Sequence, residues 1–166
     1  TTETRLHAAQ SSASECVAAA IRAKAPGRYV FTSNILSHRD ILDAIDFDPG
    51  FKGWGWEDVD WGLRVAADYP VLHIDNTATH LGLDRDAKLI EKYQGSAENF
   101  ARLIERHPDT MTSTPLYRMA KSMRHIPGRK VIETSALKLA TLRSAPVKAR
   151  LFGLKLYRAS VYGARL

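Results

Sequence analysis

The spacing of apolar positions changes along the chain, and these changes divide it into predicted helices and short strands. Residues 4–24 carry small residues at helical spacing, and the helix they predict is closed by Pro26-Gly27. β-branched and aromatic residues gather in 28–34 (RYVFTSN) and 69–76 (YPVLHIDN), which predicts two short strands. Further helices are predicted over 37–45, over 56–67, over 84–107 with a break near Gly95, and from Thr114 onward. The pattern predicts a predominantly helical α+β protein.

All three tryptophans fall in the segment Gly53–Trp61 (GWGWEDVDW), which also holds the densest cluster of carboxylates in the chain. An indole face packs against the C–H face of a sugar ring, and a carboxylate accepts hydrogen bonds from hydroxyls and can remove a hydroxyl proton. Neighbouring glycines let the backbone approach a ligand closely. The segment therefore indicates a sugar-handling site with a catalytic carboxylate.

A structural interpretation of the same segment stays open. Residues 56–67 begin with acidic side chains, which interact favourably with the positive end of a helix dipole. Trp56 and Trp61 could then be core residues rather than ligand contacts. Asp60 faces another side of the predicted helix from Asp58, and orienting or capping the motif is the favoured role for it.

The segment GWGWEDVDW resembles the acceptor-side motif of GT-A-fold glycosyltransferases, whose usual form is Gly-Trp-Gly-x-Glu-Asp-x-Asp-Leu. It is similar to the family 2 enzymes of bacterial polysaccharide synthesis and to the galactosyltransferase C-terminal domain. Two flanking runs resemble segments of that family in the same order, Phe31–Ile35 before the motif and Thr77–Gly82 after it. The resemblance covers about residues 29–83 and implies the C-terminal half of a nucleotide-diphospho-sugar transferase fold.

The resemblance also implies an inverting transfer, in which a carboxylate removes the proton from the acceptor hydroxyl that attacks the sugar. Asp58 matches the catalytic aspartate of the family and is the candidate general base, and Glu57 would bind acceptor hydroxyls. Trp54 would be the platform beneath the sugar. The other residues expected to contact the substrate are Gly55, Trp56, Asn34 and Asp60.

His80 matches a metal-binding histidine of the family, and the implied cofactor is Mn²⁺ or Mg²⁺, which would neutralise a nucleotide diphosphate leaving group. His73 is its rival and is interpreted as a core residue of the second predicted strand. Enzymes of this family carry an N-terminal half that ends in an Asp-x-Asp and holds the sugar nucleotide. Nothing before residue 29 resembles that half, so the chain is expected to be part of a transferase and inactive by itself.

Composition fits a single globular domain, with 166 residues of which 45% are hydrophobic and 25% are charged. The single Cys16 excludes an intramolecular disulfide and a Cys-based zinc site, and we expect it to be a small buried residue of a helix. No apolar run reaches the ~18–20 residues that span a bilayer, and the N-terminus shows no signal pattern. These features favour a cytoplasmic protein, with peripheral attachment to a membrane left open.

The net charge of +6 is distributed unevenly. Residues 1–111 hold 12 Lys and Arg against 17 Asp and Glu, whereas residues 112–166 hold 12 against a single glutamate. We therefore divide the chain into an acceptor-side portion, 1–112, and a basic helical arm, 113–166. Apolar and basic positions alternate over 147–161, as in a helix that lies on an anionic membrane, but a helix packed on its own domain fits equally well.

Three functions are compatible with these features. The first is a glycosyltransferase that moves a sugar from a nucleotide-sugar donor to a glycan or lipid-linked acceptor. The second is a carbohydrate-binding module without catalysis. The third is a basic interaction protein at a membrane surface; nucleic acid is not expected as a partner, because the arm lacks interleaved aromatic residues. Apolar surface left exposed by an incomplete fold would also favour a homo-oligomer.

Overall fold

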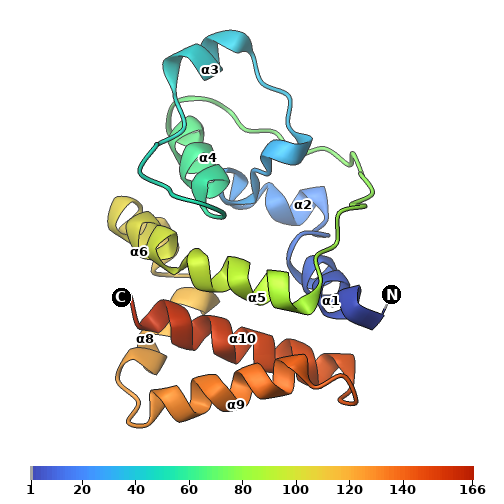
Figure 1. Cartoon of the computed structure of the whole chain (residues 1–166). Helices are drawn as coiled ribbons and strands as arrows, with labels where there is room; N and C mark the ends of the chain where they lie inside the picture. The colour runs from blue at the N-terminus through green and yellow to red at the C-terminus, as the bar shows by residue number, and fades with distance from the viewer. Residues whose placement is uncertain (1) are drawn as a thin grey trace.

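The computed structural model describes residues 2–166, and 64% of the chain is helical, which confirms the predominantly helical prediction. The helices lie in upper, middle and lower tiers (Figure 1). Their bounds are α1 (Arg5–Ser14), α2 (Ala19–Arg22), α3 (Arg39–Ala44), α4 (Glu57–Asp68), α5 (Asp86–Gly95), α6 (Ala97–Arg106), α7 (Pro108–Met111), α8 (Pro115–Arg124), α9 (Arg129–Thr141) and α10 (Val147–Gly163). Short 3₁₀ turns occur at Thr2–Thr4 (η1), Pro26–Tyr29 (η2) and Thr32–Asn34 (η3).

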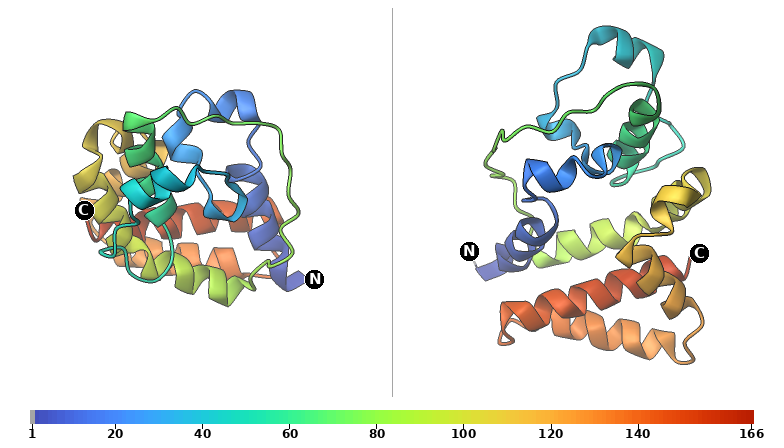
Figure 2. Two further views of the ribbon diagram at one scale, coloured as in Figure 1. Left: turned by 90° about the horizontal axis from the view of Figure 1, so that it is seen from above. Right: turned by 180° about the vertical axis from the view of Figure 1, so that it is seen from behind.

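α10 forms the centre of the lower half and contacts α1, α5, α6, α8 and α9 (Figures 1 and 2). Gly153 lets α10 lie close to α9, since a Cβ there would be 2.8 Å from the carbonyl oxygen of Ala136. Leu154 is buried with Leu6 and Leu89, so helices of the basic and acidic parts of the chain share one core cluster. Of the two interpretations of this helix, the structure shows the one packed on its own domain.

Local signals placed several helix ends correctly. Pro115 begins α8, and the Thr114 hydroxyl caps it by accepting a hydrogen bond from the backbone N–H of Tyr117 at 3.2 Å. The predicted helix over 4–24 is interrupted, however, because α1 ends at Ser14. Cys16 lies exposed in the break before α2, so the prediction of a buried cysteine is wrong.

The two predicted strands are wrong, because no strand forms within residues 2–166 and the sheet of the expected α+β class is missing there. Residues 28–34 contain 3₁₀ turns, and residues 69–76 are extended without a paired neighbour. β propensity favours extended backbone, but a strand also needs another strand to exchange hydrogen bonds with. Leu72 and Ile74 therefore remain 84% and 68% exposed.

α4 is held on two sides, and this fixes the position of the motif that begins it. Trp61 packs with Val30 in a small upper cluster. Val59 and Leu63 pack against the cluster that contains Phe100 of α6. Because both contacts involve apolar side chains at helical spacing, α4 links the upper tier to the middle one.

Candidate functional site

The segment before α4 turns sharply, because three of its residues have a left-handed backbone. The angle φ is +70° at Gly53, +98° at Gly55 and 82° at Trp56. Glycine adopts this conformation readily, whereas an L-residue such as tryptophan loses about 1–2 kcal/mol in it. Asn99 of α6 holds the turn: its amide nitrogen donates to the carbonyls of Lys52 and Gly55 at 2.9 Å each, and its Oδ1 accepts from the Lys52 N–H at 3.0 Å.

Trp56 directs its indole ring into the interior. The ring centroid lies 5.0 Å from that of Phe100 and 6.1 Å from that of Tyr162. The indole N–H donates to the Tyr162 hydroxyl at 3.2 Å, and that hydroxyl is 2.6 Å from Ser96 Oγ. Aromatic burial of this kind contributes several kcal/mol, which offsets the cost of the left-handed backbone.

Arg158 of α10 places its guanidinium among three aromatic rings. Its Cζ is 5.1 Å from the ring centroid of Trp56, 4.5 Å from that of Tyr93 and 5.1 Å from that of Tyr162. Its Nε is buried and has no hydrogen-bond partner within residues 2–166. Burial raises the pKa of Tyr93 to about 12, although the charge of Arg158 opposes that rise. These contacts tie α10 and α5 to the start of α4.

The three tryptophans have different surroundings. Trp61 is 3% exposed and donates from its indole N–H to the carbonyl of Ile45 at 2.7 Å. Trp54 is 44% exposed; its ring centroid lies 5.8 Å from that of Tyr93, edge to face, and 5.3 Å from the Lys92 ammonium. Trp54 therefore offers the most open ring surface of the three, whereas Trp56 and Trp61 contribute to the core.

Glu57 and Asp58 occupy the first turn of α4 and are half-buried. Both carboxylate oxygens of Asp58 accept hydrogen bonds from Thr32, one from its backbone N–H at 3.1 Å and one from its hydroxyl at 3.0 Å. Glu57 Oε2 is buried and has no hydrogen-bond partner in the described part of the chain. An unpaired buried acceptor costs about 1–3 kcal/mol, so most folded proteins satisfy such atoms.

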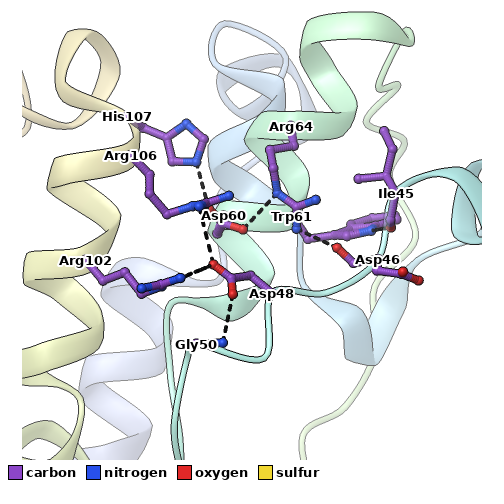
Figure 3. Close-up of polar contacts among 10 residues, drawn as sticks. All are labelled: Ile45, Asp46, Asp48, Gly50, Asp60, Trp61, Arg64, Arg102, Arg106 and His107. Atoms are coloured by element: carbon purple, nitrogen blue, oxygen red, sulfur yellow. Dashed lines mark hydrogen bonds and ion pairs between the residues drawn. The ribbon is translucent and has the colours of Figure 1, made fainter.

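Asp60 is completely buried and joins three basic side chains (Figure 3). Its Oδ2 accepts from Arg64 Nε at 2.9 Å, its Oδ1 accepts from Arg106 Nε at 2.8 Å, and His107 Nε2 lies 2.9 Å from the same Oδ1. Burial would raise the pKa of Asp60, but the hydrogen bonds from Arg106, His107 and Arg64 outweigh it and hold the pKa below 3.8. This environment matches the orienting role, because Asp60 presents no surface to a substrate.

Asp48 extends this network along the loop before the motif (Figure 3). Its carboxylate accepts from the Gly50 N–H at 2.7 Å and from Arg102 at 2.7 Å, and Arg106 lies 3.4 Å away. The Gly50 hydrogen bond and then Arg102 hold the pKa of Asp48 below its usual value. The loop over 46–53 is thereby fastened to α6.

Asn34 is placed next to the extended segment rather than at the motif. Its Nδ2 donates to the Asn76 carbonyl at 3.0 Å, and the Asn76 side chain donates back to Asn34 Oδ1 at 3.1 Å. Thr32, in the same 3₁₀ turn, is the residue that reaches Asp58. The run that resembles the family thus contacts the motif through Thr32.

His80 is exposed, and its ring meets the ring of His7 edge-on at 5.7 Å. Within residues 2–166 no group of three or more His, Cys, Asp or Glu could hold a metal ion. His73 is half-buried and lies 2.9 Å, through Nε2, from the Pro26 carbonyl oxygen. Divalent cations of this kind take about six ligands, so His80 would need companions from outside the described residues.

Sequence reasoning missed Asn99, Arg158 and Tyr162, which lie far from the motif in the chain but shape it in space. Two of them leave a weak signal. Asn99 is a poor helix former in the interior of a helix, and Arg158 interrupts the apolar side of a buried helix. Neither signal indicates which distant segment the side chain contacts.

Across residues 2–166, no helix combines the length and the apolar character that crossing a membrane requires. The resemblance to the glycosyltransferase motif rests on GWGWEDVDW and its two flanking runs. Comparisons of the chain with protein-family models, with curated proteins and with solved structures found no match.

Proposed function

We propose that the start of α4 is the acceptor site of an inverting glycosyltransferase, which takes a sugar from a nucleotide-sugar donor and passes it to a glycan or lipid-linked acceptor. The exposed ring of Trp54 carries this proposal. It sits on a turn fixed by Asn99, just before Glu57 and Asp58 in the first turn of α4. A sugar stacked on that ring would direct hydroxyl groups toward the two carboxylates.

Asp58 has the chemistry of a general base. The Thr32 hydroxyl donates to Asp58 as an acceptor hydroxyl would, and each carboxylate oxygen keeps a second lone pair for another donor. During transfer, Asp58 would take the hydroxyl proton while the acceptor oxygen bonds to the anomeric carbon of the sugar. The bond from that carbon to the nucleotide diphosphate breaks in the same step.

Glu57 would complete the site by binding a second hydroxyl of the acceptor. Its Oε2 lacks a partner and is buried, so the carboxylate would turn toward the acceptor before a sugar hydroxyl donates to it, and that hydrogen bond would satisfy an atom that the folded protein leaves unpaired. The left-handed backbone of Trp56 supports this interpretation, because strained residues concentrate at functional sites.

A nucleotide-binding portion is part of this proposal, because the implied GT-A sheet is not formed by residues 2–166. The extended residues 69–76 have a strand-like sequence, and Leu36, Leu72 and Ile74 are all largely exposed. Such segments are suited to pairing with further strands. The described residues alone bring together no group of three or more His, Cys, Asp or Glu that could hold Mn²⁺ or Mg²⁺.

Replacing Asp58 with asparagine tests the proposed base in the enzyme that carries the nucleotide-binding portion. The amide keeps the shape but cannot take the proton, so transfer from labelled sugar nucleotides should fall by ~10²–10⁴ while donor binding changes little. Asp68→Asn, at the exposed end of the same helix, is the matched control. Near-normal transfer by Asp58→Asn would exclude Asp58 as the base.

A carbohydrate-binding module without catalysis is the second candidate. The observation in its favour is that Thr32 already occupies both oxygens of Asp58, while Trp54 remains open. In that case the protein binds a glycan through Trp54 but transfers no sugar, whichever nucleotide donor is supplied. This function is supported if the protein binds a glycan but transfers no sugar to it, even when the nucleotide-binding portion and a sugar-nucleotide donor are present.

A further inference from the structure

The last three helices and the turns between them carry an excess of positive charge that is only partly compensated: Arg143, Arg150 and Arg165 pair with Glu3, Asp86 and Glu98. Glu133 is the single acidic side chain between residues 112 and 166, against 12 Lys and Arg. Its Oε2 pairs with Arg129 at 3.1 Å and its Oε1 pairs with Lys130 at 3.0 Å. No side-chain carboxylate of α8, α9 or α10 is therefore left to neutralise the other basic residues.

The outward side of α9 combines this charge with exposed apolar residues. Val131 is 70% exposed and Leu142 is 51% exposed, and about three helical turns separate them along one stripe. Lys138 lies between them and has no ion pair within residues 2–166. The opposite side of the helix, with Ala136 and Ala140, is buried.

The same combination continues across the turn into α10. Val147 is 40% exposed and is followed by the exposed Lys148, which likewise has no ion pair anywhere in the described chain. One turn further on, Phe152 is 59% exposed and lies between Lys148 and Lys155 on the helix surface. Exposed apolar side chains thus occur together with the unpaired Lys138 on α9 and the unpaired Lys148 on α10.

We propose that this outer face docks on an anionic lipid bilayer. Lysine ammonium groups are attracted by anionic headgroups, and neighbouring aliphatic side chains insert shallowly between them. The proposal leaves the inward-facing apolar positions of α10 out of the bilayer, because Leu154 is 1% exposed and belongs to the core. The docking face consists of Lys130, Val131, Lys138, Leu142, Val147 and Lys148.

A bilayer fits this face better than nucleic acid does. Single-stranded nucleic acid is bound by several aromatic side chains interleaved with basic ones, but α9 has no aromatic residue, and of the aromatic residues of α10 only Phe152 is exposed. Exposed valine and leucine side chains make no favourable interaction with phosphates. Their transfer from water to the acyl boundary of a bilayer lowers the free energy.

Docking through α9 would point the motif away from the lipid. α9 lies at the bottom of the molecule and α4 near the top, as the front and back views agree (Figures 1 and 2). The acceptor site would then face the aqueous side. This inference is independent of the proposed transfer reaction, since the docking face and the motif share no residue.

Flotation of the intact chain with vesicles tests the proposal. Phosphatidylcholine vesicles with about one third phosphatidylglycerol should bind the protein at low salt, and pure phosphatidylcholine vesicles should not. Replacing Lys130, Lys138 and Lys148 with glutamine should weaken binding at least tenfold, since each basic residue near the surface contributes a several-fold factor. Val131→Ser with Leu142→Ser should weaken binding less and leave it salt-sensitive.

The matched control removes three exposed basic residues of the acidic part, through Lys24→Gln, Arg39→Gln and Lys88→Gln. It changes the net charge equally and should bind within twofold of the parent chain. Replacing the three docking lysines with arginine should retain binding, which separates charge from a folding defect. The proposal is overturned if the parent chain ignores the anionic vesicles, if the glutamine variant binds them as well as the parent, or if the control loses as much.

Discussion

Trp56 has a strained left-handed backbone, and its buried indole ring offsets the cost of that strain. Truncating it to alanine removes the contacts with Phe100, Tyr162 and Arg158, and leaves the backbone strain of about 1–2 kcal/mol in place, because alanine also carries a Cβ. We expect a net loss of about 2–4 kcal/mol in the free energy of unfolding. Urea denaturation measures it, with Trp54→Ala as the control, which should cost at most about 1 kcal/mol because that ring is half exposed.

Similar losses for both tryptophan variants would contradict this assignment of a core ring and a surface ring. The sequence predicted the chemistry of the motif but left the roles of Trp56 and Trp61 open. The reason is physical: whether an indole is buried depends on Phe100, Ser96 and Tyr162, which come from distant helices.

Asp60 predicts a pH dependence of stability with a definite sign. Its pKa in the folded protein lies below the ordinary value of 3.8, so the folded state binds fewer protons than the unfolded state in that range. Its contribution is therefore present above about pH 4 and is lost as the pH falls through the folded pKa. Asp60→Asn should lower stability at pH 7 by about 1–3 kcal/mol and flatten the acid limb of the stability curve.

The measurement is urea denaturation at neutral pH and at several values below pH 4. Asp75→Asn, at an exposed position in the extended segment, should leave both the neutral stability and the acid limb unchanged. If the stability of Asp60→Asn falls with pH as steeply as that of the parent protein, the contacts of Asp60 with Arg106 and His107 do not control the acid dependence of stability.

At the scale of elements, the pairing of α9 with α10 depends on a small residue. Gly153→Ala would place a Cβ 2.8 Å from the Ala136 carbonyl oxygen, so the helices must separate, at a cost of about 1–3 kcal/mol. Gly95→Ala, at the end of α5, meets open space and should stabilise by about 0.5–1 kcal/mol through helix propensity. Thermal unfolding distinguishes the two, and a stabilising effect of Gly153→Ala would contradict the close packing.

The helices could be predicted because caps and apolar spacing are local signals. Thr114-Pro115 and the break at Gly95 both marked true helix ends. The strands predicted over 28–34 and 69–76 do not form, because a strand forms only when a second strand supplies its hydrogen bonds, and no local signal shows whether that second strand is present. Residues 2–166 contain no such partner for Val71–His73, although the sequence there alternates as a strand does.

At the scale of the whole molecule, the proposed acceptor site and the proposed docking face lie at opposite ends. The motif at the start of α4 is attached to α5, α6 and α10 through Asn99, Tyr93 and Arg158. The unpaired lysines of the docking face, Lys138 and Lys148, lie on α9 and in the first turn of α10. The charge imbalance could be seen in the sequence. The burial of α10 and the exposure of α9 could not, because the two helices carry similar proportions of apolar and basic residues.

The most direct test of the acceptor site is glycan binding by the chain, followed through tryptophan fluorescence on titration with a panel of glycans. At least one glycan class should bind, and Trp54→Ala should weaken it by about 1–2 kcal/mol, a factor of about 5–30, without unfolding the protein. Asp58→Asn should keep the affinity, because a base acts on the bound hydroxyl rather than holding the ring. Absence of binding across the panel, or equal affinity in Trp54→Ala, would contradict the account.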